Sequence, residues 1–187
     1  MSVVGVLLAA GAGTRYGSPK ALAHDGSWLR GAVTALRAGG CDQVVVVLGA
    51  AAEQARALVP EGVEVVVAAD WQSGMAASLR AGLRAARERD AGAALVQLVD
   101  TPDVGADVVA RVLGVAAGSL DTALARASFH GAPRHPVLFG RHHLGAVIDT
   151  ATGDAGARDF LRGRPDVVLV ECGDLATGAD HDTPEPA

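Results

Sequence analysis

The feature that most constrains this chain is an apolar run, Val3–Ala10, that leads directly into a glycine-rich loop. An uninterrupted apolar run is typical of a strand buried on both faces, as in a parallel sheet. The loop, Gly11–Lys20, holds three glycines and two cations, Arg15 and Lys20. Glycine costs about 0.5–1 kcal/mol relative to alanine in ordered structure, so this cluster indicates a backbone that closely approaches a ligand. The cations indicate that the ligand is an anion. The pattern predicts a phosphate or nucleotide site at the carboxyl end of the first strand.

Apolar runs alternate with helical segments through residue 118. The expected strands are 3–9, 43–48, 63–68 and 93–99, and the expected helices are 29–38, 51–58, 74–89 and 104–115. Continuous apolar strands separated by helices predict an α/β fold with a doubly wound, mostly parallel sheet and helices on both faces. Ligands of such sheets bind beyond the carboxyl ends of the strands, which points to the segments 11–20, 70–74 and 100–103.

The pattern changes after about residue 119. The expected elements there are antiparallel strands at 122–128 and 137–139, a connection at 130–136, a short helix at 153–163 and a strand at 167–170. These elements form a small antiparallel addition in the C-terminal half. Because 187 residues contain no evident linker or repeat, we expect a single domain, 1–187.

Composition excludes several classes of function. The net charge of −5 gives no general electrostatic footprint for nucleic acid, and 3% aromatic residues offer few stacking platforms. The cysteines, Cys41 and Cys172, form no CxxC pair and are expected to be free thiols in a reducing, cytoplasmic setting. The first apolar run is too short to span a membrane. The six histidines show no metal-ligand spacing, so we expect no zinc site.

Three types of phosphate loop compete for the glycine-rich segment. A dinucleotide loop requires G-x-G-x-x-G, but Tyr16 stands where the third glycine belongs. The second strand also ends in Leu48-Gly49-Ala50, without an acidic residue for a ribose. A Walker loop requires Gly-Lys-Ser/Thr, whereas Lys20 follows Pro19 and precedes Ala21. A dinucleotide-dependent oxidoreductase and a Walker-type NTPase are therefore both disfavoured.

The third type fits. The spacing L-A-A-G-x-G-T-R-x-G-x-x-K over 8–20 resembles the signature loop of nucleotidyltransferases, and more narrowly the MobA-like branch that includes the molybdenum cofactor cytidylyltransferases. The resemblance implies a nucleotide-diphospho-sugar transferase-like fold, with residues 1–118 binding nucleotide and 119–187 binding the acceptor. The segment 71–83 is similar to the family's G-M-x-x-S-L-x-x-G-L motif. By resemblance, the nucleotide-binding residues are Leu8, Ala9, Ala10, Gly11, Ala12, Gly13, Thr14, Arg15, Lys20, Gly74 and Ser78.

Asp100-Thr101-Pro102 follows the fourth strand and resembles the family's Asp-x-Pro motif, whose Asp binds Mg²⁺. The tail segment 180–185 is similar to D-I-D-T-P-E, and one Asp of that motif joins the metal. The resemblance therefore implies Asp100 with Asp180 or Asp182 as metal ligands. It also implies catalytic roles for Arg15, Lys20 and Asp100.

Two segments of the C-terminal half resemble acceptor-side motifs. Residues 134–139 are similar to G-H-P-V-L-F, with Arg134 in place of the usual glycine. Residues 153–158 are similar to G-D-x-G-A-R of the molybdopterin cytidylyltransferases. The acceptor-binding residues implied are His135, Pro136, Asp154 and Arg158. The tail departs from its motif at His181, which replaces an apolar residue.

The expected reaction is Mg²⁺-dependent transfer of a nucleoside monophosphate to a phosphorylated acceptor, with release of pyrophosphate. The Leu-Ala-Ala-Gly form of the loop implies CTP, and the 153–158 match implies molybdopterin as acceptor. A sugar phosphate or an isoprenoid precursor is the alternative acceptor. A different class of function is a non-catalytic nucleotide- or pterin-binding maturation factor with a molybdoenzyme client. Neither nucleic acid nor membrane is expected as a partner.

Overall fold

The computed structural model describes residues 2–116 and 118–183. Its strands are β1 (Val3–Ala9), β2 (Gln43–Leu48), β3 (Glu64–Val67), β4 (Ala93–Leu98), β5 (Leu124–Phe129), β6 (Ala132–Gly140) and β7 (Val168–Glu171). Its α-helices are α1 (Ala23–Ala38), α2 (Ala52–Arg56), α3 (Met75–Glu88), α4 (Ala106–Gly114), α5 (Arg141–Thr150) and α6 (Arg158–Leu161). Short 3₁₀ helices lie at Lys20–Leu22, Trp71–Ser73, Leu120–Thr122 and Gly153–Ala155.

The strands form one sheet in the order β3-β2-β1-β4-β6-β5-β7. Strands β1 to β4 run parallel, β6 pairs antiparallel with both β4 and β5, and β7 runs parallel to β5. The order of the parallel strands reverses at β1, because the chain first adds β2 and β3 on one side and then β4 on the other. This reversal, at the carboxyl ends of β1 and β4, is where doubly wound sheets bind ligands. The prediction of a mostly parallel α/β sheet is confirmed.

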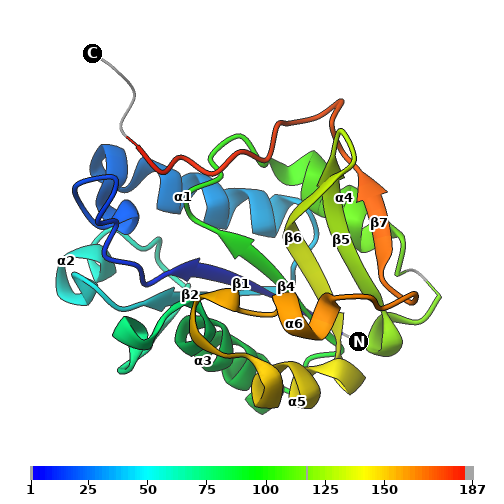
Figure 1. The fold of residues 1–187 in the computed structure, drawn as a ribbon. Helices are drawn as coiled ribbons and strands as arrows, with labels where there is room; N and C mark the ends of the chain where they lie inside the picture. Colours follow the sequence, from blue (N-terminus) through cyan, green and yellow to red (C-terminus); the bar gives the residue numbers. More distant parts are fainter. Residues whose placement is uncertain (1, 117, 184–187) are drawn as a thin grey trace.

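Helices cover both faces of the sheet (Figure 1). Side chains of β1 alternate between two apolar layers: Leu7 packs in the layer of α1 and α4, whereas Val6 packs in the layer of α3 and α5. The first layer includes Leu29 of α1 and Val109 of α4, and the second includes Leu83 of α3. These layers immobilise the carboxyl ends of the central strands, so the loops that follow them start from fixed positions. Within the described residues, no helix is long and apolar enough to cross a membrane.

The structure of the C-terminal half differs from the prediction in three places. The expected connection at 130–136 is wrong, because His130 and Gly131 both have positive φ (51° and 80°) and form a two-residue turn, so β6 begins at Ala132. The expected helix at 153–163 divides into a 3₁₀ turn and the four-residue α6. Helix α5 was not predicted, although Leu144, Val147 and Ile148 give it a buried face at helical spacing.

Candidate functional site

A cleft of about 660 Å³ lies beyond the carboxyl ends of β1 and β4. The glycine-rich loop after β1 forms one wall together with the start of α3. Asp100 lies at the base, at the end of β4. The C-terminal half contributes Asp154, Arg158 and the tail residues Asp180 and Asp182 to the lining, and this part is called the C-terminal wall. The two halves of the chain therefore meet at this cleft.

The glycine-rich loop folds back on itself at Gly13. This residue has φ +60°, and a Cβ there would lie 1.9 Å from the Ser18 carbonyl oxygen, so no other residue fits. The Gly17 amide donates a hydrogen bond to the Gly13 carbonyl at 2.8 Å and closes the turn. Gly11 differs, because a Cβ there would meet no described atom within 4 Å. The backbone at Gly11 is thus open on its cleft side, as a loop that cradles phosphates requires.

Lys20 connects the loop to two carboxylates from distant parts of the chain. Its Nζ donates to Asp100 Oδ2 at 2.7 Å and to Asp182 Oδ1 at 2.8 Å. Arg15 Nη2 lies 2.9 Å from the other oxygen of Asp182. The Lys20 side chain is only 13% exposed, whereas that of Arg15 is 76% exposed. Lys20 is therefore a fixed cation at the base of the cleft, and Arg15 is a solvated one at its mouth.

The ionisation of these groups follows from their neighbours. Burial alone would lower the pKa of Lys20, but its hydrogen bonds to Asp100 and Asp182 and their charges raise it above its ordinary value. The hydrogen bond from Lys20 lowers the pKa of Asp182. Burial and the nearby charge of Asp100 raise the pKa of Asp180. Lys20 and Asp182 are consequently an ionised pair at neutral pH.

One oxygen of Asp100 is left over from this network. Its Oδ1 is buried and has no hydrogen-bond partner among the described residues. An orphaned buried carboxylate oxygen costs free energy unless something binds it. Hard divalent cations prefer carboxylate oxygen, so the atom fits a metal ligand. No group of three acidic, histidine or cysteine side chains is preassembled around a metal position in the described chain; instead, Lys20 bridges Asp100 and Asp182.

Gly74 joins the two predicted motif segments. It has φ 109° and ψ −178°, a conformation that is essentially restricted to glycine. A Cβ there would lie 2.6 Å from the Gly153 carbonyl and 2.7 Å from Asp154 Oδ1. The start of α3 therefore lies directly against the Gly153 backbone and the Asp154 side chain, and only a glycine fits there.

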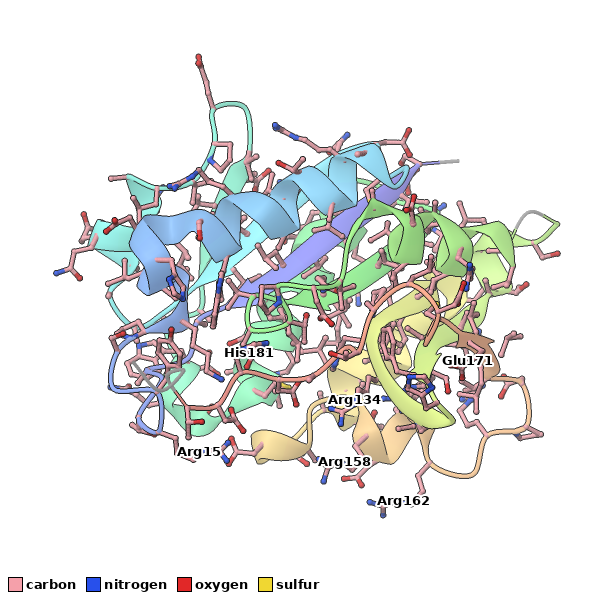
Figure 2. All side chains as sticks on the ribbon, turned by 90° about the horizontal axis from the view of Figure 1, so that it is seen from above. Arg15, Arg134, Arg158, Arg162, Glu171 and His181 are labelled. Atoms are coloured by element: carbon pink, nitrogen blue, oxygen red, sulfur yellow. The ribbon has the colours of Figure 1, made fainter. Side chains whose placement is uncertain are left out.

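The tail is held across the cleft by contacts at both ends. The His181 amide donates to the Asp100 carbonyl oxygen at 2.9 Å, and the His181 ring lies edge-on to Trp28 with centroids 5.3 Å apart. Thr177 donates to Asp103 Oδ2 from its amide and its hydroxyl, at 2.7 and 2.6 Å. Figure 2 shows His181 on the tail between the glycine-loop side, where Arg15 lies, and the C-terminal side, where Arg134 and Arg158 lie. The predicted motif residues 184 and 185 lie outside the described part of the chain.

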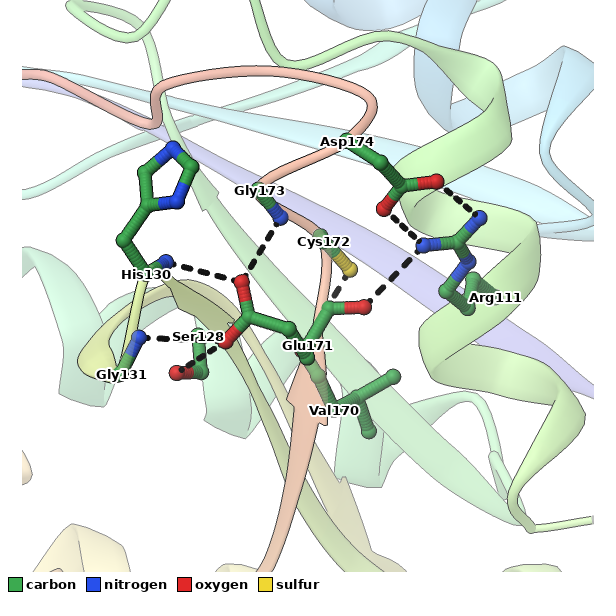
Figure 3. Close-up of polar contacts among 9 residues, drawn as sticks. All are labelled: Arg111, Ser128, His130, Gly131, Val170, Glu171, Cys172, Gly173 and Asp174. Atoms are coloured by element: carbon green, nitrogen blue, oxygen red, sulfur yellow. Dashed lines mark hydrogen bonds and ion pairs between the residues drawn. The ribbon is translucent and has the colours of Figure 1, made fainter.

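Glu171 holds the strands behind the C-terminal wall. Its carboxylate accepts bonds from the amides of His130, Gly131 and Gly173, at 2.8 to 3.2 Å, and from Ser128 Oγ at 3.0 Å (Figure 3). The three backbone bonds, with the hydroxyl, lower the pKa of Glu171 to about 2. This carboxylate therefore fastens the β5–β6 turn to the end of β7.

The structure brings most of the predicted site residues to one cleft. The cleft lining includes every predicted nucleotide-binding residue, namely Leu8, Ala9, Ala10, Gly11, Ala12, Gly13, Thr14, Arg15, Lys20, Gly74 and Ser78. It also includes Asp100, Asp154, Arg158, Asp180 and Asp182. Two predicted acceptor residues, His135 and Pro136, are not in this lining. They lie within β6, where Val137 pairs with Val96 of β4, so the strand carries them into the sheet.

Other lining residues were not selected from the sequence. Tyr16, Trp71, Gln72 and Met75 line the cleft, and Trp28 supports the tail from outside it. In a chain with so few aromatic residues, a Tyr and two Trp in or beside the motif segments were a usable signal.

Comparisons with known proteins agree with this geometry. The model of the family described as the MobA-like NTP transferase domain matches residues 5–168. A nicotine blue oxidoreductase from Paenarthrobacter nicotinovorans is 42% identical over 198 residues, spanning 98% of this chain and 93% of that protein.

Several solved structures have a similar fold over most of the chain. Rv0371c from Mycobacterium tuberculosis H37Rv is 30% identical with a TM-score of 0.77, over 92% of this chain and 88% of that one. A second structure of Rv0371c, in complex with manganese, is 28% identical with a TM-score of 0.72, over 92% and 89%. A nucleotidyl transferase from Methanothermobacter thermautotroptrophicus shares the fold, with a TM-score of 0.78 at 20% identity over 97% and 92%. The chain belongs to the MobA-like NTP transferase domain family, and the prediction of a nucleotidyltransferase is confirmed at that level.

Proposed function

We propose that this nucleotidyltransferase moves CMP from CTP to a phosphorylated acceptor, with molybdopterin as the first acceptor to test. The observation that carries the proposal is the meeting of Lys20, Asp100 and Asp182 beside an open glycine loop, within one cleft at the switch point of the sheet. A bound triphosphate needs such cations, and a divalent ion needs such carboxylates.

The chain's residues bind and orient in this reaction. The amides of the glycine loop and the cations Arg15 and Lys20 hold the β- and γ-phosphates. An oxygen of the acceptor phosphate then attacks the α-phosphorus in line, and the bond to the leaving pyrophosphate breaks. Positioning and charge neutralisation account for the rate, because such a displacement needs no covalent enzyme intermediate. Lys20 exchanges its carboxylate partners for phosphate oxygens when the NTP binds.

A divalent cation, Mg²⁺ in this proposal, would be held by Asp100 and by Asp180 or Asp182. When bound, it supplies charge neutralisation between the phosphates and the carboxylates. The orphaned Oδ1 of Asp100 supports this assignment, and so does the manganese complex of the related Rv0371c.

The assignments of CTP and molybdopterin rest on the resemblance of two sequence segments to family motifs. The Leu8–Gly11 segment supports CTP, and the 153–158 segment supports molybdopterin. In this proposal residues 1–118 bind nucleotide, residues 119–187 bind the acceptor, the chain acts as one domain in the cytoplasm, and a molybdoenzyme is the client. His135 and Pro136 shape the acceptor wall from within β6 rather than touching the acceptor. Sugar phosphates and isoprenoid precursors remain the alternative acceptors.

A second candidate function is oxidoreduction, favoured by the 42% identity to a nicotine blue oxidoreductase over nearly the whole chain. In this candidate, the cleft would hold a nicotinamide dinucleotide by its phosphates and a heteroaromatic substrate beside it. Tyr16 in place of the third loop glycine weighs against a dinucleotide loop of the usual type.

One paired experiment separates these functions. Pyrophosphate release is measured with each of four NTPs, Mg²⁺ or Mn²⁺, and a panel of phosphorylated acceptors including molybdopterin. Oxidation of NADH and NADPH is measured in parallel with nicotine blue. Metal-dependent pyrophosphate release that is fastest with CTP supports the proposal. Oxidation of NADH or NADPH without pyrophosphate release supports the second candidate. Tight binding of CTP or a pterin with neither reaction indicates a maturation factor.

A further inference from the structure

We propose that Arg126, Arg134 and Arg158 form a phosphate-binding subsite that holds the acceptor on the C-terminal wall of the cleft. The inference rests on the proposed function and deepens it, since it assigns a phosphate monoester of a small molecule as the ligand. It adds Arg126 and Arg134, which no motif selected, to the predicted Arg158.

The three arginines come from three elements and converge. Arg126 lies in β5, Arg134 in β6 and Arg158 at the start of α6. Arg126 Nε donates to the Arg134 carbonyl oxygen at 3.3 Å, so the Arg126 side chain lies against the backbone of Arg134, although Arg126 itself pairs with Val137 in the ladder. Arg134 Nη1 lies 3.6 Å from Asp180 Oδ2. Asp180 and Arg158 both line the cleft, whereas Arg126 and Arg134 lie behind this lining. Figure 2 shows Arg134 and Arg158 along one margin of the molecule, with Arg162 extending farther out.

Carboxylates neutralise these three cations only weakly. No carboxylate of the described chain forms an ion pair with Arg126 or Arg158, and the contact of Arg134 with Asp180 is long. By contrast, the nearby arginines Arg162 and Arg164 pair with Asp159 and Asp166 at 2.9 and 2.6 Å. Arg126 is half-buried, and a half-buried charge without a counter-ion is costly, so a bound anion would compensate for it.

The local electrostatics agree with a positively charged site. Burial and the charge of Arg158 lower the pKa of Arg126. Burial and the charge of Arg126 lower the pKa of His135 to about 4, so this ring is neutral at physiological pH. The positive potential therefore comes from the arginines. Planar guanidinium groups bind both phosphate and carboxylate through two parallel bonds, and the higher negative charge of a phosphate monoester favours it at a site with three cations.

The position of the cluster favours the acceptor over the NTP. Arg15 and Lys20 already serve the glycine-loop wall, whereas the arginine cluster reaches the cleft through Asp180 on the other side. A phosphate held there would lie between the C-terminal wall and Asp100, where an attacking oxygen is needed. Arg134 replaces the glycine that the family motif has at this position, so this contact is a feature of this chain.

The test titrates inorganic phosphate and glycerol phosphate into the full chain by calorimetry. All proteins carry Lys20→Ala, so that the loop cation does not compete for the anion. Arg158→Gln and Arg134→Gly are tested as single variants and as a double variant. Arg162→Gln, which removes an exposed arginine outside the cleft, is the separate control. Arg126→Gln is added if its thermal unfolding midpoint shows that it folds. Acetate serves as the carboxylate ligand, and CTP affinity is measured separately on variants that retain Lys20.

The affinity of the double variant for both phosphates should fall by about tenfold or more, and that of each single variant should fall by less. The affinity of Arg162→Gln should stay within about twofold of that of its parent. Acetate should bind more weakly than phosphate. Phosphate affinity that is unchanged in the double variant, or equally reduced in Arg162→Gln, would overturn the subsite whether or not CTP binds. Phosphate binding that depends on Arg134 and Arg158 in a chain that binds no CTP would retain the subsite and refute the proposed function.

Discussion

The two walls of the cleft both carry cations, but these differ in whether carboxylates neutralise them. On the glycine-loop wall, Lys20 and Arg15 are already neutralised by Asp100 and Asp182, at 2.7 to 2.9 Å. On the C-terminal wall, Arg126 and Arg158 have no carboxylate partner within the described residues, and Arg134 has only the 3.6 Å contact with Asp180. The first wall must exchange partners to bind a ligand, whereas the second already presents its charge.

This difference suggests an order of events. In the proposed function, an NTP that reaches the loop would displace Asp100 and Asp182 from Lys20, which would free those carboxylates for a divalent cation. Since the C-terminal wall needs no such exchange, its affinity for an anion should depend little on the metal.

The largest effect is expected at Asp100, on which the first wall depends. Asp100→Asn keeps the size of the side chain but removes the charge that pairs with Lys20 and that the proposed function assigns to metal binding. We expect turnover to fall by about 10²-fold or more, equivalent to about 2.7 kcal/mol of barrier. Metal-dependent pyrophosphate release measures this, with Asp107→Asn, an exposed carboxylate of α4, as control. Near-normal kinetics in Asp100→Asn would remove it from the catalytic machinery.

The next effect concerns the contact between the two walls. Gly74→Ala places a Cβ against the Gly153 carbonyl in a glycine-only conformation, which should cost about 2 kcal/mol of unfolding free energy. Gly114→Ala, in α4 with open space around its Cβ, should leave stability unchanged or raise it slightly. Denaturant unfolding measures both. Equal stability of the two variants would mean that the walls are not joined at Gly74.

The sequence predicts the first wall far better than the second. Strands β1 and β2 match their predicted bounds residue for residue, because buried parallel strands are continuous apolar runs that local pattern detects. The loop motif follows directly from β1, so its position at the cleft was predictable once the sheet order was assumed.

The second wall depends on contacts that local pattern does not contain. The turn at His130–Gly131 moved the start of β6 to Ala132 and carried His135 into the sheet. Arg126 lies close enough to Arg158 for the charge of Arg158 to lower the pKa of Arg126, although the two residues belong to a strand and a short helix far apart in sequence. The position of Gly74 against Gly153 is likewise a tertiary contact, although the motif already marked both segments.

A smaller effect is expected at Lys20, the one lysine of the chain. Lys20→Ala should weaken CTP binding about tenfold, the value of a charge-assisted hydrogen bond, while Arg84→Ala on the exposed side of α3 should not. Because its pKa is raised, Lys20 should also react with amine-directed acylating reagents more slowly than an exposed lysine at mildly alkaline pH. Bound CTP should slow that reaction further, as measured by peptide mass spectrometry. CTP affinity that is unchanged in Lys20→Ala, measured by calorimetry, would exclude a triphosphate role.

The smallest effect is expected at Glu171, which fastens the strands behind the C-terminal wall, and it should depend on pH. The folded-state pKa of Glu171 is about 2, below its ordinary value near 4.5, so ionised Glu171 stabilises the fold above pH 4.5. This contribution should fade as the pH falls from 4.5 towards 2. Glu171→Gln should therefore lower the denaturant midpoint at pH 7 and converge with the wild-type chain near pH 2. Asp174→Asn, which removes the exposed ion pair with Arg111, should have a smaller effect at pH 7. A difference between Glu171→Gln and wild type that persists at pH 2 would mean that the carboxylate charge does not fasten the β5–β6 turn to β7.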